Sequence, residues 1–119
     1  ERKYSTIFNE ARDGIVLTDA GTGRIEDCNP RFEDLTGRKV PDLRKMKIWE
    51  IRPPEKRDKA RETFLELCRK GVGASDALEF RKPDGTIVPI DVVARKVKYQ
   101  GRDIILSIAR DITDRRRAE

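Results

Sequence analysis

The last third of the chain places the strongest limit on its fold. Two long runs of β-forming residues, Thr86 to Tyr99 and Asp103 to Ile112, are separated only by the turn residues Gln100-Gly101. A shorter run, Ala77 to Lys82, precedes them across the turn signal Pro83-Asp84-Gly85. Because strands joined by tight turns pair in antiparallel fashion, this region predicts three neighbouring strands of one antiparallel sheet.

The first third combines two helical patterns with two short strands. Apolar residues recur at helical spacing over Arg2 to Arg12, which predicts an amphipathic helix. Short strands are expected at Ile15 to Thr18 and at Arg24 to Cys28. Asn29-Pro30 begins a second helix, because Asn caps free N–H groups and Pro suits the first helical position. Gly37 is expected to end this helix in a left-handed conformation.

Helical patterns fill the middle of the chain. Short turns are expected at Asp42 to Met46 and at Ile48 to Ile51, and a regular helix at Pro54 to Lys70. The chain closes on another helical pattern, Asp111 to Glu119. Strands, then helices, then strands predict an α+β domain with helices over one face of an antiparallel sheet.

Composition excludes several classes of function. The 119 residues suffice for one domain, and none of them is His. Without imidazole the chain lacks the usual acid–base catalyst and the base of Ser–His and Cys–His systems. It also lacks the usual zinc and haem ligand. We therefore expect no catalytic residue and no metal site. Two cysteines are too few for a disulfide framework and fit a reducing cytosol. No apolar run approaches the ~18 residues of a membrane span.

The net charge of +5 is concentrated in one segment. Between Arg38 and Arg61 ten basic residues stand against four acidic ones, so this segment carries +6 and the rest of the chain −1. It has no recognition helix, zinc site or aromatic platform, and this favours a solvated basic face over specific nucleic-acid binding. The sequence does not decide whether this basic segment meets an acidic metabolite, an anionic partner domain or a membrane surface.

Short motifs spread along the chain resemble those of the PAS domain family, including its PAC-type C-terminal strands. The resemblance spans nearly the whole chain, and its motifs are Ala11–Asp19, Gly23-Arg24-Ile25, Asn29-Pro30-Arg31-Phe32, Leu35-Thr36-Gly37, Asp84-Gly85-Thr86 and Ala109–Arg115. It implies a PAS fold: a five-stranded antiparallel sheet in the order 2-1-5-4-3, with helices on one face and flanking N- and C-terminal helices. It also implies an N-terminal flanking helix at 1–12, the PAS domain at 13–113 and the start of an output or linker helix at 114–119.

In such domains the helices can enclose a ligand pocket against the sheet. Trp49 could stack on a flat cofactor or anchor the packing of two helices. The apolar candidates either line a pocket or fill an ordinary core. The candidate pocket residues are Ile25, Phe32, Leu35, Trp49, Phe64, Cys68, Leu78, Phe80 and Val92.

Two cofactors known in the family are disfavoured. Haem-binding members use a His that this chain lacks, which leaves only Cys68 or Met46 as a conceivable ligand. Flavin photoreceptors of the family carry the motif Asn-Cys-Arg-Phe-Leu-Gln, whereas Asn29-Pro30-Arg31-Phe32 has Pro in place of the reactive Cys. Cys28 precedes Asn29 in a strand and does not replace that thiol. We therefore expect no cofactor, although non-covalent flavin stays open.

The resemblance further implies that Asp111 and Thr113 pass a signal from the last strand to an output helix. The expected function is a regulatory sensor and dimerisation module of a larger signalling protein, most simply a bacterial-type sensor histidine kinase acting in a two-component phosphorelay. A transcriptional regulator or a cyclic-dinucleotide enzyme is the alternative parent. A homodimer is expected through the N-terminal helix or the outer sheet face. The module is expected in the cytoplasm or in the cytoplasmic part of a membrane-anchored sensor.

Overall fold

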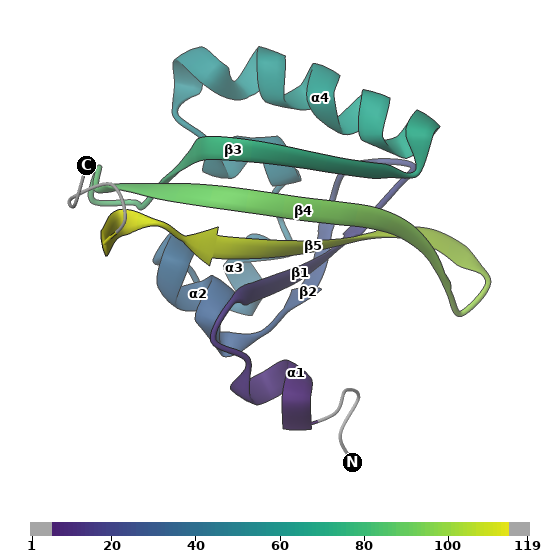
Figure 1. The fold of residues 1–119 in the computed structure, drawn as a ribbon, viewed down its shortest axis with the longest axis horizontal. Helices are drawn as coiled ribbons and strands as arrows, with labels where there is room; N and C mark the ends of the chain where they lie inside the picture. The colour runs from purple at the N-terminus through teal and green to yellow at the C-terminus, as the bar shows by residue number, and fades with distance from the viewer. Residues whose placement is uncertain (1–5, 115–119) are drawn as a thin grey trace.

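Residues 6–114 are described by the computed structural model, and a single antiparallel sheet runs through them (Figure 1). The strands are joined in the order β2-β1-β5-β4-β3, so the first and last strands pair inside the sheet, in the order expected for a PAS fold. The strands are β1 (Gly14–Asp19), β2 (Ile25–Cys28), β3 (Val72–Arg81), β4 (Ile87–Tyr99) and β5 (Arg102–Asp111).

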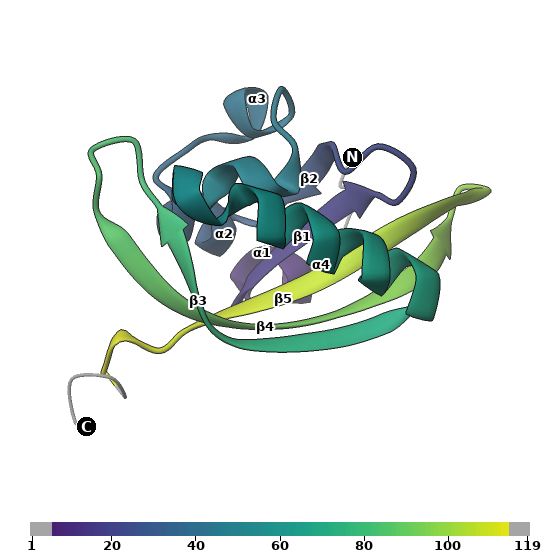
Figure 2. The same cartoon turned by 90° about the horizontal axis from the view of Figure 1, so that it is seen from above.

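The helices between β2 and β3 gather on one face of the sheet, and the sheet curves around them (Figure 2). Figure 1 looks onto the opposite face, across β4, β5 and β1. No helix within 6–114 is both long enough and apolar enough to cross a membrane. The helices are α1 (Thr6–Glu10), α2 (Pro30–Thr36), α3 (Val40–Leu43), the 3-10 turns η1 (Ile48–Ile51) and η2 (Pro54–Lys56), and α4 (Arg57–Lys70).

Local sequence signals explain the ends of several elements. The side chain of Asn29 caps α2 by accepting a hydrogen bond from the Phe32 amide at 3.0 Å. Gly37 closes the same helix at φ +67° and Gly71 closes α4 at φ +88°, in the left-handed region that glycine adopts without steric cost. Gln100 and Gly101 both take positive φ between β4 and β5, which is the two-residue hairpin turn expected there.

Three boundaries differ from the sequence-based predictions. The short helix expected at 42–46 occupies Val40–Leu43, since Pro41 fits a first helical turn. The helix expected from Pro54 begins as η2 and becomes α-helical at Arg57. β3 begins at Val72 rather than Ala77, because residues of low β-propensity pair there with β4, ahead of a register shift between Ser75 and Leu78.

The flanking helices are only partly described. Within the predicted helix over 1–12, Thr6–Glu10 is helical and lies beside α2. The predicted output helix at 114–119 lies outside the described residues except for its first residue, so both flanking boundaries stay predictions.

The core lies between the sheet and the helices. Its centre is Phe32 of α2, which is fully buried and meets the ring of Phe80 edge-on at 5.6 Å between centroids. Ile90 of β4 and Leu43 of α3 are also completely buried. These residues pack α2 and α3 against the sheet, and Phe32 and Phe80 also border the open space under α4.

Candidate functional site: the cavity under α4

Small side chains leave a hollow on the helix-covered face of the sheet. Gly73, Ala94 and Ser107 lie side by side on β3, β4 and β5. In the next row Ala109 lies beside Val92. These side chains are too small to fill the space between the sheet and α4, and a cavity of about 690 Å³ remains there. This volume falls in the ~300–1,000 Å³ range of small-molecule sites.

Helical residues form the opposite wall. Phe64 and Leu67 of α4 and Trp49 of η1 line the cavity from the helix side. Charged side chains at its margin, such as Lys59 and Asp76, are exposed, so the cavity reaches the protein surface.

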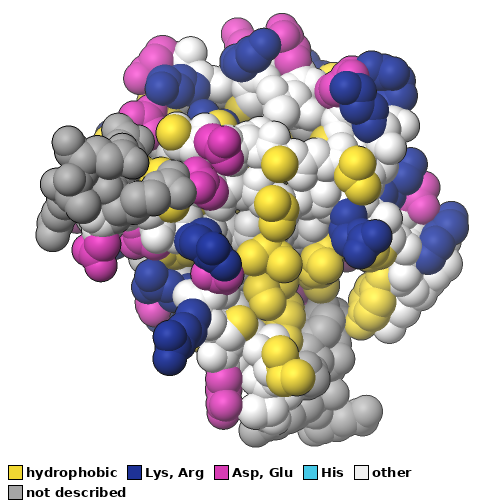
Figure 3. Space-filling model, in the orientation of Figure 1, with side chains coloured by type: hydrophobic (Ala, Val, Ile, Leu, Met, Phe, Trp, Pro, Cys, Tyr) yellow, Lys and Arg dark blue, Asp and Glu magenta, His cyan; other side chains and the backbone are white. Residues whose placement is uncertain are grey.

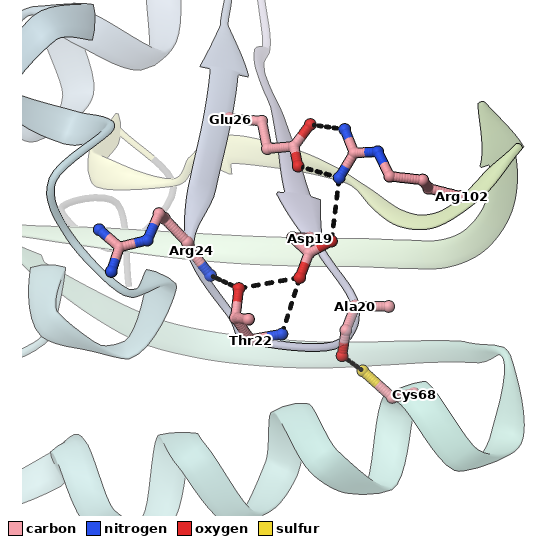
Figure 4. Close-up of polar contacts among 7 residues, drawn as sticks. All are labelled: Asp19, Ala20, Thr22, Arg24, Glu26, Cys68 and Arg102. Carbon is pink, nitrogen blue, oxygen red and sulfur yellow. Dashed lines mark hydrogen bonds and ion pairs between the residues drawn. The ribbon is translucent and has the colours of Figure 1, made fainter. Parts of the chain in front are cut away.

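The cavity brings together six of the nine residues proposed from the sequence. These are Phe32, Trp49, Phe64, Leu78, Phe80 and Val92. Ile25 and Leu35 do not line it, because both are buried in the solid part of the core. Cys68 does not line it either. Its Sγ lies 3.5 Å from the carbonyl oxygen of Ala20, in a separate shallow hollow (Figure 4).

Trp49 serves both as a packing anchor and as part of the cavity wall. Its ring lies against Gly23, where a Cβ atom would come within 2.6 Å of the ring carbon Cη2. It also meets Phe64 edge-on at 5.7 Å, and the guanidinium of Arg61 lies 5.7 Å from the ring centroid. The ring is thus held in a fixed orientation beside the cavity.

Arg52 lines the cavity, and the sequence reasoning missed it. Its Nε donates a hydrogen bond to the carbonyl oxygen of Glu79 at 2.8 Å, which brings the guanidinium to the cavity wall. Burial lowers the pKa of Arg52 from its usual value, and the nearby Glu79 carboxylate partly offsets this. As one of ten basic residues between Arg38 and Arg61, Arg52 carries no signal that singles it out.

Neither cysteine is placed for thiolate chemistry. Burial, with smaller contributions from Glu33 and Asp27, raises the pKa of Cys28 to about 12. Burial also raises the pKa of Cys68. Among residues 6–114, no three Cys, Asp or Glu side chains lie together as metal ligands would.

A polar network beside Cys68 ties the β1–β2 turn to the β4–β5 hairpin (Figure 4). Asp19 accepts hydrogen bonds from the amide and hydroxyl of Thr22, both at 2.8 Å. The guanidinium of Arg102 reaches Asp19 at 3.1 Å and Glu26 at 2.6 Å. Because these contacts are exposed to solvent, they orient the turn more than they stabilise the fold.

The end of β5 carries the second predicted site, the Asp111–Thr113 junction. Asp111 accepts hydrogen bonds from the amide and hydroxyl of Thr113, at 2.8 and 2.5 Å. Its other oxygen lies 3.7 Å from Nη2 of Arg31 in α2, and Arg31 Nε donates to the carbonyl oxygen of Arg12 at 3.0 Å. Arg31 therefore links the exit from β5 with the entry to β1. The sequence reasoning placed Arg31 in a motif but gave it no role.

The sheet order β2-β1-β5-β4-β3 with helices on one face matches one known family. A sequence profile of that family, described as "PAS domain", matches residues 12–114. The chain belongs to the PAS domain family. Solved PAS domains share its backbone: one from Colwellia psychrerythraea superposes with a TM-score of 0.78 over 91% of this chain and 92% of its own, at 22% identity.

Two curated relatives are sensors. The methyl sulfide methyltransferase-associated sensor of Methanosarcina acetivorans is 31% identical over 119 residues, and the sensor histidine kinase TmoS of Ectopseudomonas mendocina is 28% identical over 123 residues. Both alignments cover 100% of this chain but only 12% of the relative, so the chain spans a small part of the length of these proteins.

Proposed function

We propose that this PAS domain is the non-catalytic input module of a larger sensor protein, in which a small molecule held in the cavity under α4 is the signal. The cavity itself carries the proposal, because its volume and its mostly apolar wall, with a few polar groups, suit a small-molecule ligand. The ligand would be held without a covalent bond or a metal ion. A relative that is a sensor histidine kinase favours such a kinase as the parent. In that parent the module would lie on the cytoplasmic side.

Asp111 is the proposed exit for the signal. β5 lies between the cavity and the junction: Ala109 lines the cavity, and Asp111 follows two residues later on the same strand. A ligand that shifts β5 would therefore act on the contacts of Asp111 with Thr113 and Arg31. These contacts are the physical basis for coupling the cavity to a downstream helix.

Asp111→Ala in the full-length parent tests this role. The variant should fold, since its contacts are only half-buried, yet its signal-dependent autophosphorylation should change by about fivefold or more. Asp103→Ala is the matched control, because Asp103 also makes an ion pair, with Lys98, but lies at the β4–β5 hairpin. Regulation that survives intact in Asp111→Ala would refute the signalling role.

A second copy of the domain is the proposed occupant of the outer sheet face. Val93, Ile108 and Ile15 form one continuous apolar row across β4, β5 and β1, and Leu106 and Leu17 extend it. Figure 3 shows a band of hydrophobic side chains down the middle of this face. Because Val93 is 53% exposed at the centre of the sheet, a two-fold partner laid across the strands would cover it.

Val93→Glu should weaken this dimer, because it places a charge in a buried apolar contact. Sedimentation equilibrium should give a dissociation constant raised by about tenfold or more. Leu65→Glu on α4 is the control, since Leu65 is equally exposed, at 53%, but lies on the opposite side of the sheet. Equal weakening by both variants, or by neither, would contradict the proposed interface.

A further inference from the structure

The cavity contains a cation without a carboxylate partner. Arg52 uses Nε for the Glu79 carbonyl, while its Nη1 and Nη2 atoms have no hydrogen-bond or ion-pair partner among the residues that the structure describes. The carboxylate of Glu79 lies 2.6 Å from Lys56 Nζ and is occupied there. Two donors of a half-buried guanidinium are therefore free at the cavity wall.

The other charges around the cavity offset the charge of Arg52 only in part: the Glu79 carboxylate is near it, but Glu79 is ion-paired with Lys56. Glu66 is already paired with Lys70 at 3.2 Å and with Arg69. Lys59 and Asp76 are exposed at the margin, where water screens them. The remaining uncompensated charge is positive and lies on the half-buried Arg52.

The rest of the wall is apolar and aromatic. The rings of Trp49, Phe64, Phe32 and Phe80 all line the cavity. The Arg52 amide donates to the Trp49 carbonyl at 3.3 Å, so the indole ring and the guanidinium come from one turn of chain. A ligand that contacts both the indole ring and the guanidinium would need an apolar group close to an anionic group.

We propose that the cavity binds an amphipathic monocarboxylate, whose apolar body packs among the aromatic rings and whose carboxylate accepts hydrogen bonds from Nη1 and Nη2 of Arg52. The planar fork of a guanidinium matches the two oxygens of a carboxylate. One unpaired cation balances one negative charge, which favours a monoanion over a phosphate dianion. This inference rests on the proposed function of the cavity as the signal site, and it names the chemical class of the signal.

Trp49 is the only tryptophan of the chain, so its emission reports on the cavity directly. The probes are 4-phenylbutyrate and its neutral twin 4-phenylbutanamide, titrated by Trp49 fluorescence and by calorimetry. The carboxylate should bind the wild-type chain about tenfold or more tighter than the amide. Arg52→Gln should lower the affinity for 4-phenylbutyrate by a similar factor and leave the affinity for 4-phenylbutanamide unchanged.

The amide is also the folding control, because its unchanged affinity shows that Arg52→Gln retains the cavity. Arg44→Gln makes the same change of charge in the same basic segment at an exposed residue that does not line the cavity, and it should bind both probes like wild type. Equal binding of both probes, or carboxylate binding that survives Arg52→Gln, would overturn the ligand class while the cavity stays a binding site. Failure of both probes would also overturn the class, whereas the proposed function is decided separately by the Asp111→Ala output.

Discussion

Single buried polar side chains fix how the first elements of this PAS domain meet. Asn29 is completely buried and makes four hydrogen bonds. Its Oδ1 accepts from the amides of Ile15 and Phe32, and its Nδ2 donates to the carbonyls of Phe8 and Asp13, all between 2.9 and 3.0 Å. One amide group thus joins α1, β1 and α2, well beyond the helix cap that the sequence predicts.

Asn29→Ala should therefore lower the free energy of unfolding by about 2–4 kcal/mol, because it leaves several buried backbone groups without partners. Thr22→Ala is the comparison: it removes the exposed hydrogen bonds that the Thr22 hydroxyl makes with Asp19 and with the Arg24 amide, and should cost under about 1 kcal/mol. Urea denaturation of both variants measures the difference. Similar losses would mean that Asn29 acts only as a cap.

At the scale of helices and strands, boundaries set by neighbouring residues were predicted from the sequence, whereas a boundary set by pairing between distant strands was not. The cap of α2, the glycine ends of α2 and α4 and the β4–β5 turn follow from neighbouring residues, and all were predicted. The early start of β3 was not, because Gly73 and Ser75 are strand residues only through their pairing with β4. The pairing of β3 with β4 also brings together the small residues under α4, so the shape of the cavity could not be predicted from the sequence.

The packing of η1 on the β1–β2 turn can be tested through Gly23. Gly23→Ala would force a Cβ into the ring of Trp49 at a φ of +80°. We expect a loss of stability greater than the ~1–2 kcal/mol of left-handed strain alone, together with a shift in Trp49 emission.

The variant Gly101→Ala separates the effect of backbone strain on stability from the effect of the contact with Trp49. Gly101 has nearly the same φ, +79°, but nothing lies within 4 Å of the added Cβ, so it should lose only the strain energy and keep the wild-type emission. If the two variants lose the same stability and neither changes the emission, the contact between Gly23 and Trp49 does not position the ring.

At the scale of the whole molecule, the family resemblance predicted the sheet order, whereas the site needed the structure. Six of the nine predicted pocket residues line the cavity because large apolar residues of β3, α2 and α4 must face inward. Arg52 and Arg31 could not be predicted, since their roles depend on contacts with Glu79 and Arg12, far away in the sequence. The charge excess between Arg38 and Arg61 thus includes one residue with a specific place in the cavity.

The proposed function requires that the cavity under α4 and the junction at Asp111 be energetically coupled through β5. A double-mutant cycle on the full-length parent tests it without knowledge of the ligand. Ala94→Phe fills the cavity from the sheet side, and it should move the autophosphorylation level by about fivefold or more. In the double variant with Asp111→Ala that change should disappear. An effect of Ala94→Phe that persists unchanged beside Asp111→Ala, or a folded Ala94→Phe variant with wild-type output, would contradict the account.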